Sequence, residues 1–223
     1  MGLEEKMVKK KGPSDFVARY IHQPIENWAV SRLVHTSITP NQVTLATNLL
    51  AYLTTFLYLR GEIAAGLAVA LVVGVLDGID GKLARAKEMA SKVGKLEHAF
   101  DLLYEFSWLA ALGLYYTQAT GKTAPLTAAL LSMLFISFYR MVYDVFGRVT
   151  GVSLDIYSPV ERVARRVLGR RNLYNLHILA GLALGSWRFL ETITAHAALT
   201  AIFYTWRAWR HLSQLDRDMH QNH

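Results

Sequence analysis

The sequence contains no cysteine in 223 residues, which excludes disulfide bonds and thiolate metal sites. It also lacks the pattern of a cleavable signal peptide, because residues 1–12 are rich in lysine and no apolar segment follows them closely. No internal repeat is evident along the chain. These absences leave an ordinary, non-repetitive chain whose character must be inferred from its apolar and charged residues.

Apolar residues make up 52% of the chain, and the mean hydropathy is +0.21. That composition alone is compatible with one or two soluble domains. However, apolar stretches of about 20 residues recur, which is the length an α-helix needs to cross a bilayer. We therefore predict an all-α integral membrane protein with six transmembrane helices and an N-terminal amphipathic interfacial helix.

The six apolar segments set the predicted organisation. They are expected as helices over residues 42–59, 63–85, 95–116, 126–146, 173–190 and 192–209. Thr39 and Pro40 are typical of a helix N-cap and first turn, and they mark where the first helix begins. The divisions are a basic tail (1–13), the interfacial helix (14–37), a six-helix transmembrane domain (38–212) and a polar tail (213–223).

Two shorter segments are expected to lie outside the membrane. Residues 16–34 place apolar side chains at helical spacing, but charged residues interrupt them, so this helix is expected to lie on the membrane surface. Pro24 is expected to break or kink it. A short surface helix is expected within residues 159–168.

The formal net charge of +7 is distributed in a way that predicts orientation. If the six helices alternate in direction, 20 of the 24 lysines and arginines fall on one side of the membrane. The positive-inside rule then places both termini on the cytoplasmic side. Because the charges sort by loop, they indicate membrane topology and anionic lipid, and we expect no nucleic-acid partner.

Four carboxylates mark the candidate site. Asp77 and Asp80 share one face of an apolar helix, where a carboxylate costs about 2.5–3.5 kcal/mol on insertion scales. Glu97 and Asp101 share a face of the next helix, so two antiparallel helices can aim four carboxylates at one another. Unpaired carboxylates in a low-dielectric environment repel or protonate. A divalent metal compensates for this, and all-oxygen ligation favours Mg²⁺ or Mn²⁺.

Asp77 and Asp80 alone are also compatible with a structural pair or an ion pathway. They stand, however, in a longer pattern that resembles the signature of the CDP-alcohol phosphotransferases. That signature reads Asp, two residues, Asp-Gly, two residues, Ala-Arg, eight residues, Gly, three residues, Asp, three residues, Asp. Its first half matches Asp77, Asp80, Gly81, Ala84 and Arg85, and Gly94 falls on the expected spacing.

The second half of the signature departs from this pattern. Strict counting places His98 and Leu102 at the last two aspartates. A shift of one residue gives Glu97 and Asp101, which we prefer because leucine can neither bind metal nor accept a proton. His98 remains an alternative third ligand. A register with Asp101 and Glu105 needs a larger slip and ranks last.

The resemblance implies a membrane transferase of lipid biosynthesis with residues 38–212 as its catalytic domain. It moves a phosphatidyl or phosphoalcohol group from a CDP-linked donor to an alcohol, and CMP is released. Two metal ions, Mg²⁺ or Mn²⁺, are expected on Asp77, Asp80, Glu97 and Asp101, and Asp101 also serves as general base. One of the two substrates is expected to be a lipid, the site cytoplasmic and the enzyme a homodimer.

Further residues are assigned to donor binding: Gly81, Lys82, Ala84, Arg85, Gly94 and Asn41. Gly81 and Ala84 allow close approach of a nucleotide or, alternatively, of another helix. Lys82 and Arg85 are placed to neutralise a diphosphate or to snorkel toward the interface. Asn41, after the helix cap, binds phosphate or is part of an ordinary helix start.

Arg140 is a secondary candidate, either paired with Asp144 or bound to an acceptor phosphate or lipid headgroup. Arg162, Arg165 and Arg166 offer another place for an anionic acceptor, or belong to a loop that attracts lipid. The acceptor itself stays open among inositol phosphate, glycerol phosphate, serine, ethanolamine, choline and a lipid alcohol. Two rival functions are an ion- or proton-coupled transporter and a non-catalytic relative that binds CDP-alcohol or lipid.

Overall fold

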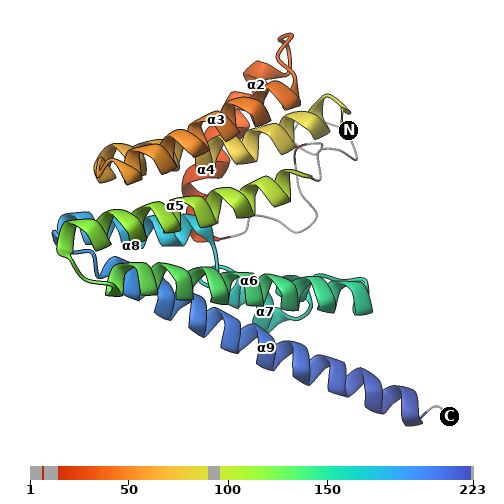
Figure 1. The fold of residues 1–223 in the computed structure, drawn as a ribbon. Coiled ribbons are helices and arrows are strands. Elements are labelled where there is room, and N and C mark those ends of the chain that lie inside the picture. Colours follow the sequence, from red (N-terminus) through yellow and green to blue (C-terminus); the bar gives the residue numbers. More distant parts are fainter. Residues whose placement is uncertain (1–6, 8–14, 90–95, 222–223) are drawn as a thin grey trace.

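The computed structural model describes Met7, residues 15–89 and residues 96–221, and within these ranges it is helical and contains no β-strand. Figure 1 shows the helices as a bundle with a C-terminal helix that extends beyond it. In chain order the elements are η1 (Ala18–His22), α2 (Gln23–Leu33), α3 (Pro40–Leu59), α4 (Ile63–Ala86), α5 (Glu97–Thr120), α6 (Ala124–Thr150), η3 (Leu154–Ile156), α7 (Pro159–Ala164), α8 (Arg171–Ala183) and α9 (Phe189–Gln221).

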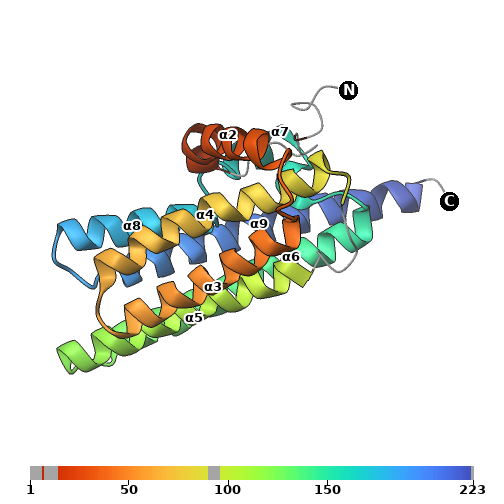
Figure 2. The same ribbon diagram turned by 90° about the horizontal axis from the view of Figure 1, so that it is seen from above.

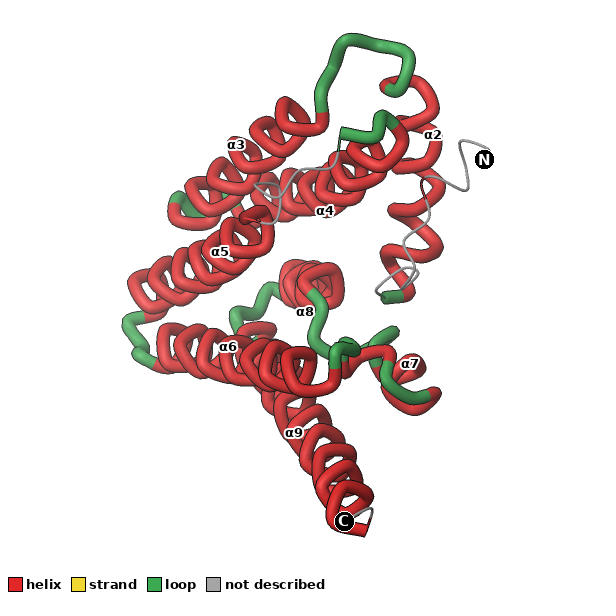
Figure 3. Tube along the Cα trace, turned by 90° about the vertical axis from the view of Figure 1, so that its right-hand side faces the viewer, coloured by secondary structure: helices red, strands yellow, loops and turns green. Residues whose placement is uncertain are grey.

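The helices pack in a chain of neighbours. α3 packs against α4 and α5, α5 packs against α6, and α6 packs against α9. α8 contacts both α4 and α9, so it joins the two ends of this series. In Figure 3, α8 lies between α4 and α5 on one side and α6 and α9 on the other. The N-terminal helix α2 covers α4 from outside the bundle (Figure 2).

The start of α3 confirms the predicted helix cap. The Thr39 side chain accepts a hydrogen bond from the Gln42 backbone N–H, and the Gln42 side chain accepts one from the Thr39 backbone N–H. This reciprocal pair satisfies two donors that a helix start otherwise leaves open. Pro40 follows in the first turn, where its missing N–H costs nothing.

Of the two outcomes expected at Pro24, a break or a kink, the break is wrong. The chain is continuously helical from Phe16 to Leu33, with a π-helical turn over Ala18–His22 directly before the proline. Proline cannot donate the hydrogen bond that an α-helix requires at an interior position. The wider π-helical turn takes up this mismatch. α2 then begins with Pro24 in its first turn.

The last two predicted helices have different boundaries in the structure. α8 ends at Ala183 and not near residue 190, and Gly185 in the turn after it has a φ of +60°. α9 continues to Gln221, well past residue 209 and into the predicted polar tail. Buried Tyr204, Arg207 and His211 repeat at helical spacing across residue 209, so an amphipathic pattern carries the helix into the first turn of this extension.

α4 and α6 are the described helices that are long and apolar enough to cross a membrane. Only 44% and 28%, respectively, of their most apolar stretches are buried inside the protein, whereas the core helix of a soluble protein is mostly buried. Leu134 on α6 and Leu45 and Leu49 on α3 are each at least 60% exposed. Such apolar outer faces suit contact with lipid. The six-span topology stays a prediction.

A buried ionic cluster fastens α7 to the extension of α9. Glu161 of α7 is fully buried and accepts hydrogen bonds from Arg207 and from Ser158. The Nε2 atom of His211 lies 2.8 Å from the same carboxylate. Burial raises the pKa of Glu161, but hydrogen bonds from Arg207, Ser158 and His211 outweigh it and lower that pKa from 4.5 to about 2. Glu161 therefore stabilises the fold in its ionised form.

We predict that Glu161→Gln lowers the free energy of unfolding by about 3–5 kcal/mol near neutral pH, because Arg207 is left as a buried, unpaired charge. Because the pKa of Glu161 is lower in the folded state than in the unfolded state, its carboxylate stabilises the fold at pH values above 4.5. This stabilisation is lost as the pH falls from 4.5 to about 2. The difference in Tm between wild type and variant, measured in detergent, should therefore shrink over this range. The exposed Glu191→Gln is the control; a gap that persists at pH 2 contradicts the assignment.

Candidate active site

Two of the predicted carboxylates from separate helices meet at one arginine. The Asp77 side chain on α4 accepts a hydrogen bond from Nη2 of Arg171 at 2.9 Å, and Asp101 on α5 accepts one from Nη1 at 3.2 Å. Arg171 is the first residue of α8. Its Cζ atom lies 5.3 Å from the centre of the Tyr104 ring. The structure therefore brings Asp77 and Asp101 together around a guanidinium group.

Asp80 lies one turn after Asp77 on α4 and is almost fully buried, at 3% exposure. Its Oδ2 atom accepts a hydrogen bond from the Thr44 hydroxyl of α3 at 2.7 Å, and its Oδ1 atom accepts one from the Gly81 backbone N–H at 2.6 Å. These donors hold the carboxylate in a fixed orientation and stabilise its charge. α3 thus contributes to the acidic cluster through Thr44.

Glu105 and Arg140 form a second ion pair beside the cluster. Glu105 on α5 is fully buried, and its Oε2 atom is paired with Arg140 of α6. The sequence had suggested Asp144 as a partner for Arg140, but Asp144 pairs with Arg148 at the exposed end of α6. Arg140 keeps 36% of its side chain exposed, whereas the Glu105 side chain is 1% exposed.

The motif cations face the N-terminal segment. Lys82 forms an ion pair with Glu26 of α2 at 2.9 Å and also donates to Asn27. Arg85 donates to the backbone carbonyl of Met7 at 3.0 and 3.3 Å. These two side chains connect α4 to Met7 and to α2. Their contact with a diphosphate, or snorkelling toward the interface, stays a prediction.

Gly81 is a motif glycine whose only near neighbour, within the described residues, is the Arg85 side chain. A Cβ built there would lie 3.6 Å from Nη1 of Arg85, an ordinary van der Waals distance, with nothing nearer. Helix packing therefore does not require glycine at this position, which favours the alternative of close approach by a ligand. Ala84 is half-buried on the same helix, and Asn41 is exposed in the first turn of α3.

Three predicted site residues lie outside what the structure describes. Gly94 falls in residues 90–95, and the side chains of Glu97 and His98 at the start of α5 are not described either. The choice among Glu97, His98 and Glu105 as a further metal ligand stays a prediction. Of these, Glu105 is engaged by Arg140.

The donor chemistry of the cluster fits a hard divalent cation. Asp77, Asp80 and Asp101 offer carboxylate oxygens, the ligands that Mg²⁺ and Mn²⁺ prefer. Among the side chains that the structure describes, no three histidine, aspartate or glutamate groups are gathered closely enough to hold a metal ion. The described arrangement is a carboxylate–guanidinium cluster, with Arg171 as the cation between Asp77 and Asp101.

Sequence reasoning missed Arg171 and Thr44. The cations weighed in the connection before α8 were Arg162, Arg165 and Arg166. Of these, Arg165 is buried with its Nε atom 3.5 Å from Asp155. Thr44 lies one helical turn after Pro40, and this part of α3 faces Asp80 of the neighbouring helix. That position is a signal from which its role could have been inferred. Nothing local distinguished Arg171 from the other loop arginines.

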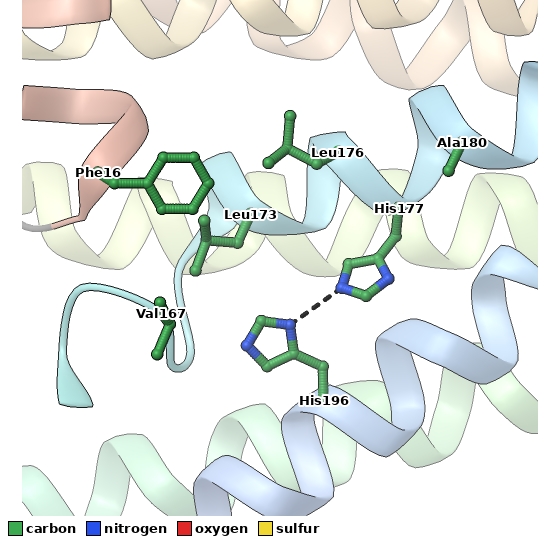
Figure 4. A pocket seen from close by; sticks show the side chains of 7 residues that line it. All are labelled: Phe16, Val167, Leu173, Leu176, His177, Ala180 and His196. Carbon is green, nitrogen blue, oxygen red and sulfur yellow. Dashed lines mark hydrogen bonds between the residues drawn. The ribbon is translucent and has the colours of Figure 1, made fainter. Parts of the chain in front are cut away.

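A cavity of about 340 Å³ opens between α8, α9 and the N-terminal segment. Figure 4 shows its lining of apolar side chains and a pair of histidines. Nε2 of His177 lies 3.0 Å from Nδ1 of His196, and Nδ1 of His177 lies 2.8 Å from the Thr192 hydroxyl. The residues that line it are Phe16, Val167, Leu173, Leu176, His177, Ala180 and His196. None is a carboxylate, so this cavity is separate from the acidic cluster.

Comparison with known proteins matches this chain to one family model and to several relatives. A family model described as CDP-alcohol phosphatidyltransferase matches residues 37–206. The bifunctional IPC transferase and DIPP synthase of Thermococcus kodakarensis is 38% identical over 104 residues, covering 46% of this chain and 24% of that protein. The protein of the same name from Aquifex aeolicus is 24% identical over 203 residues, covering 88% and 46%.

A third relative is closer to this chain in length. The archaetidylinositol phosphate synthase of Pyrococcus horikoshii is 38% identical over 148 residues, which cover 64% of this chain and 74% of that protein. By contrast, the matched part spans less than half the length of each bifunctional relative, 24% and 46%.

We predict that the Glu105–Arg140 pair matters far more for stability than the Asp144–Arg148 pair. Glu105→Gln should lower the free energy of unfolding by about 3 kcal/mol, the lower end of the range for broken buried pairs, because Arg140 is 36% exposed. Asp144→Asn should cost at most about 1 kcal/mol, since its side chain is 51% exposed. Thermal unfolding in detergent measures both; equal losses would contradict this reading.

Proposed function

The chain belongs to the CDP-alcohol phosphatidyltransferase family, and on that premise we propose that it transfers a substituted phosphate from a CDP-linked donor to an alcohol. The observation that carries the proposal is the meeting of Asp77 and Asp101, from α4 and α5, at one cation. Asp80 stands one turn away with its orientation fixed by Thr44. Such a cluster suits the charge-rich chemistry of a diphosphate.

We expect the cluster to hold Mg²⁺ or Mn²⁺, as two ions, since this family generally uses divalent metals. The proposed ligands are Asp77, Asp80 and Asp101, with Glu97 as the fourth. When bound, the metal neutralises the donor diphosphate and stabilises the departing CMP. The carboxylates hold it in place, and Thr44 keeps Asp80 oriented toward the site.

Asp101 is the proposed general base. The acceptor hydroxyl loses its proton to the Asp101 carboxylate as its oxygen attacks the phosphorus that carries the donor's alcohol group. The new oxygen–phosphorus bond forms as the bond to CMP breaks, and CMP leaves as the anion. Asp101 is suited to this role because it faces the cluster from the helix opposite Asp77 and Asp80.

Cations and open space around the cluster supply the remaining functions. Arg140 and Arg171 are placed to neutralise phosphate oxygens of either substrate. The open side of Gly81 lets the nucleotide approach the backbone of α4. Lys82 and Arg85, on the same part of α4, are proposed to neutralise the donor diphosphate, and Lys82 also pairs with Glu26 of α2.

The family is membrane-integral, and we propose six membrane segments that correspond to α3, α4, α5, α6, α8 and α9, of which α8 is short, at 13 residues. Both termini and the acidic cluster then lie on the cytoplasmic side, where 20 of the 24 lysines and arginines fall. Asp77 and Asp80 lie toward the end of α4 that leads into the basic segment after Lys82. A homodimer is part of the same proposal.

The names of the relatives favour one acceptor among those that the sequence left open. One relative is an archaetidylinositol phosphate synthase, and it shares 38% identity over 148 residues. We therefore propose an inositol phosphate as the acceptor and a CDP-linked lipid as the donor. Arg140 and Arg171 give the site the positive charge that a phosphorylated acceptor requires.

The central test is release of CMP by purified protein in detergent with Mg²⁺, a CDP-linked lipid and a panel of alcohols. We predict metal-dependent CMP release with inositol phosphate, and at least about a hundredfold loss in Asp101→Asn, which lacks the base. Asp144→Asn should keep wild-type activity. A fully active Asp101→Asn rejects the assigned base, whereas donor binding without turnover indicates a non-catalytic relative, and solute flux without CMP release a transporter.

We also predict that a chelator abolishes CMP release and that Mg²⁺ or Mn²⁺ restores it. Glu97→Gln should raise the metal concentration needed for half-maximal activity, because a carboxylate ligand is lost, whereas His98→Asn should leave it unchanged. The opposite result, with His98→Asn impaired and Glu97→Gln normal, assigns the ligand to His98.

A further inference from the structure

Arg171 lies between Asp77 of α4 and Asp101 of α5, at the centre of the acidic cluster. Its Nη2 atom is 2.9 Å from Oδ2 of Asp77, and its Nη1 atom is 3.2 Å from Oδ1 of Asp101. The Arg171 side chain is 14% exposed and each carboxylate 28%, so these charges are only partly screened by solvent. One monovalent cation thus balances part of the charge of two carboxylates.

The backbone around Arg171 is held from both sides. The preceding Arg170 forms an ion pair with Asp155 at 2.7 Å, and the following Asn172 donates a hydrogen bond to Asp15 at 3.2 Å. α8 itself packs against α4 and α9. The start of α8 is therefore held in place, so that a release of Arg171 from the carboxylates would require a change of its rotamer and not a movement of the helix.

The geometry points to Arg171 as an exchangeable counter-ion, meaning a cation that competes with the divalent metal for Asp77 and Asp101. This inference rests on the proposed function, because both carboxylates are proposed metal ligands there. A guanidinium and a metal ion on the same oxygens repel each other, so metal binding requires Arg171 to leave at least one carboxylate. The metal affinity of the cluster is then set below what its carboxylates alone would give.

A consequence is that Arg171 links metal binding to anion binding. An anion that captures the displaced guanidinium removes the competitor of the metal and so strengthens metal binding. By the reciprocity of binding equilibria, the metal strengthens binding of that anion by the same factor. The cluster thereby favours joint occupation by metal and phosphate over occupation by metal alone.

The test measures Mn²⁺ binding to the full chain in detergent, with free Mn²⁺ followed by electron paramagnetic resonance and no substrate present. Arg171→Gln should bind Mn²⁺ at least about tenfold more tightly than wild type, the scale on which a neighbouring opposite charge shifts carboxylate binding equilibria. Arg171→Lys should fall between the two, since lysine keeps the charge but cannot bridge both carboxylates. Arg148→Gln removes an equal charge from the exposed pair with Asp144, and should change the affinity less than about twofold.

Thermal unfolding gives a second readout that a merely structural role would not produce. Without added metal, Arg171→Gln should have a lower Tm than wild type, because Asp77 and Asp101 lose their bridging cation. Saturating Mn²⁺ should raise its Tm by more than it raises that of wild type. A variant with lowered Tm but an unchanged Mn²⁺ effect would show that Arg171 only holds the helices together.

The outcomes separate this inference from the function on which it rests. Asp77→Asn should weaken Mn²⁺ binding at least about tenfold; an unchanged affinity rejects the metal site and the inference together. Weaker binding in Asp77→Asn with unchanged or weaker binding in Arg171→Gln overturns the inference alone and leaves the metal site standing. If Arg171→Gln does not yield folded protein, Arg171→Lys decides by the same comparison.

Discussion

Electrostatic compensation at Asp77 and Asp101 is the constraint on which the arrangement of the bundle depends. Each carboxylate lies on a largely apolar helix, and each must meet a positive charge. The guanidinium of Arg171 serves both, and in doing so it ties the start of α8 to α4 and α5. α8 is also the element that contacts both α4 and α9, so the charge cluster and the closure of the bundle share one helix.

The two faces of α4 are used differently around this cluster. A Cβ at Gly78 would lie 2.1 Å from Oε1 of Glu26, and a Cβ at Gly74 would lie 2.8 Å from Cε1 of His22. The N-terminal helical segment therefore packs directly on the backbone of α4 at these two glycines. At Gly81, one turn further on, a Cβ would meet only Nη1 of Arg85, at an ordinary contact distance of 3.6 Å. Glycine thus serves helix packing on one part of α4 and access on another.

Membership of a membrane-integral transferase family gives these features a common purpose. Apolar outer faces on α3, α4 and α6 suit a lipid environment, while buried ion pairs such as Glu105–Arg140 and Glu161–Arg207 hold polar elements within it. A membrane transferase that moves a substituted phosphate needs both: an apolar surface that faces lipid, and a charged interior where the phosphates react.

The sequence by itself determined most of the helices, the cap at Thr39 and the grouping of Asp77 with Asp80. These depend on local periodicity, on side chains within one turn, and on residue types that act over short spans. It did not predict that helix would continue through Pro24 or along the C-terminal extension, because a π-helical turn and buried contacts between α7 and α9 decide those features.

The tertiary structure alone decided which charges meet. Arg171 is 94 residues from Asp77 and 70 from Asp101, and Arg140 is 35 from Glu105. No local pattern distinguishes Arg171 from the other arginines of its basic segment, and none identifies Glu105 as the partner of Arg140, because these pairings depend on which helix faces pack together. Asp144 was the nearer partner for Arg140 in sequence, yet burial of Glu105 made the distant pairing the one that forms. Spacing within a helix could identify the acids, but only the packing of α8 against α4 could bring them their cation.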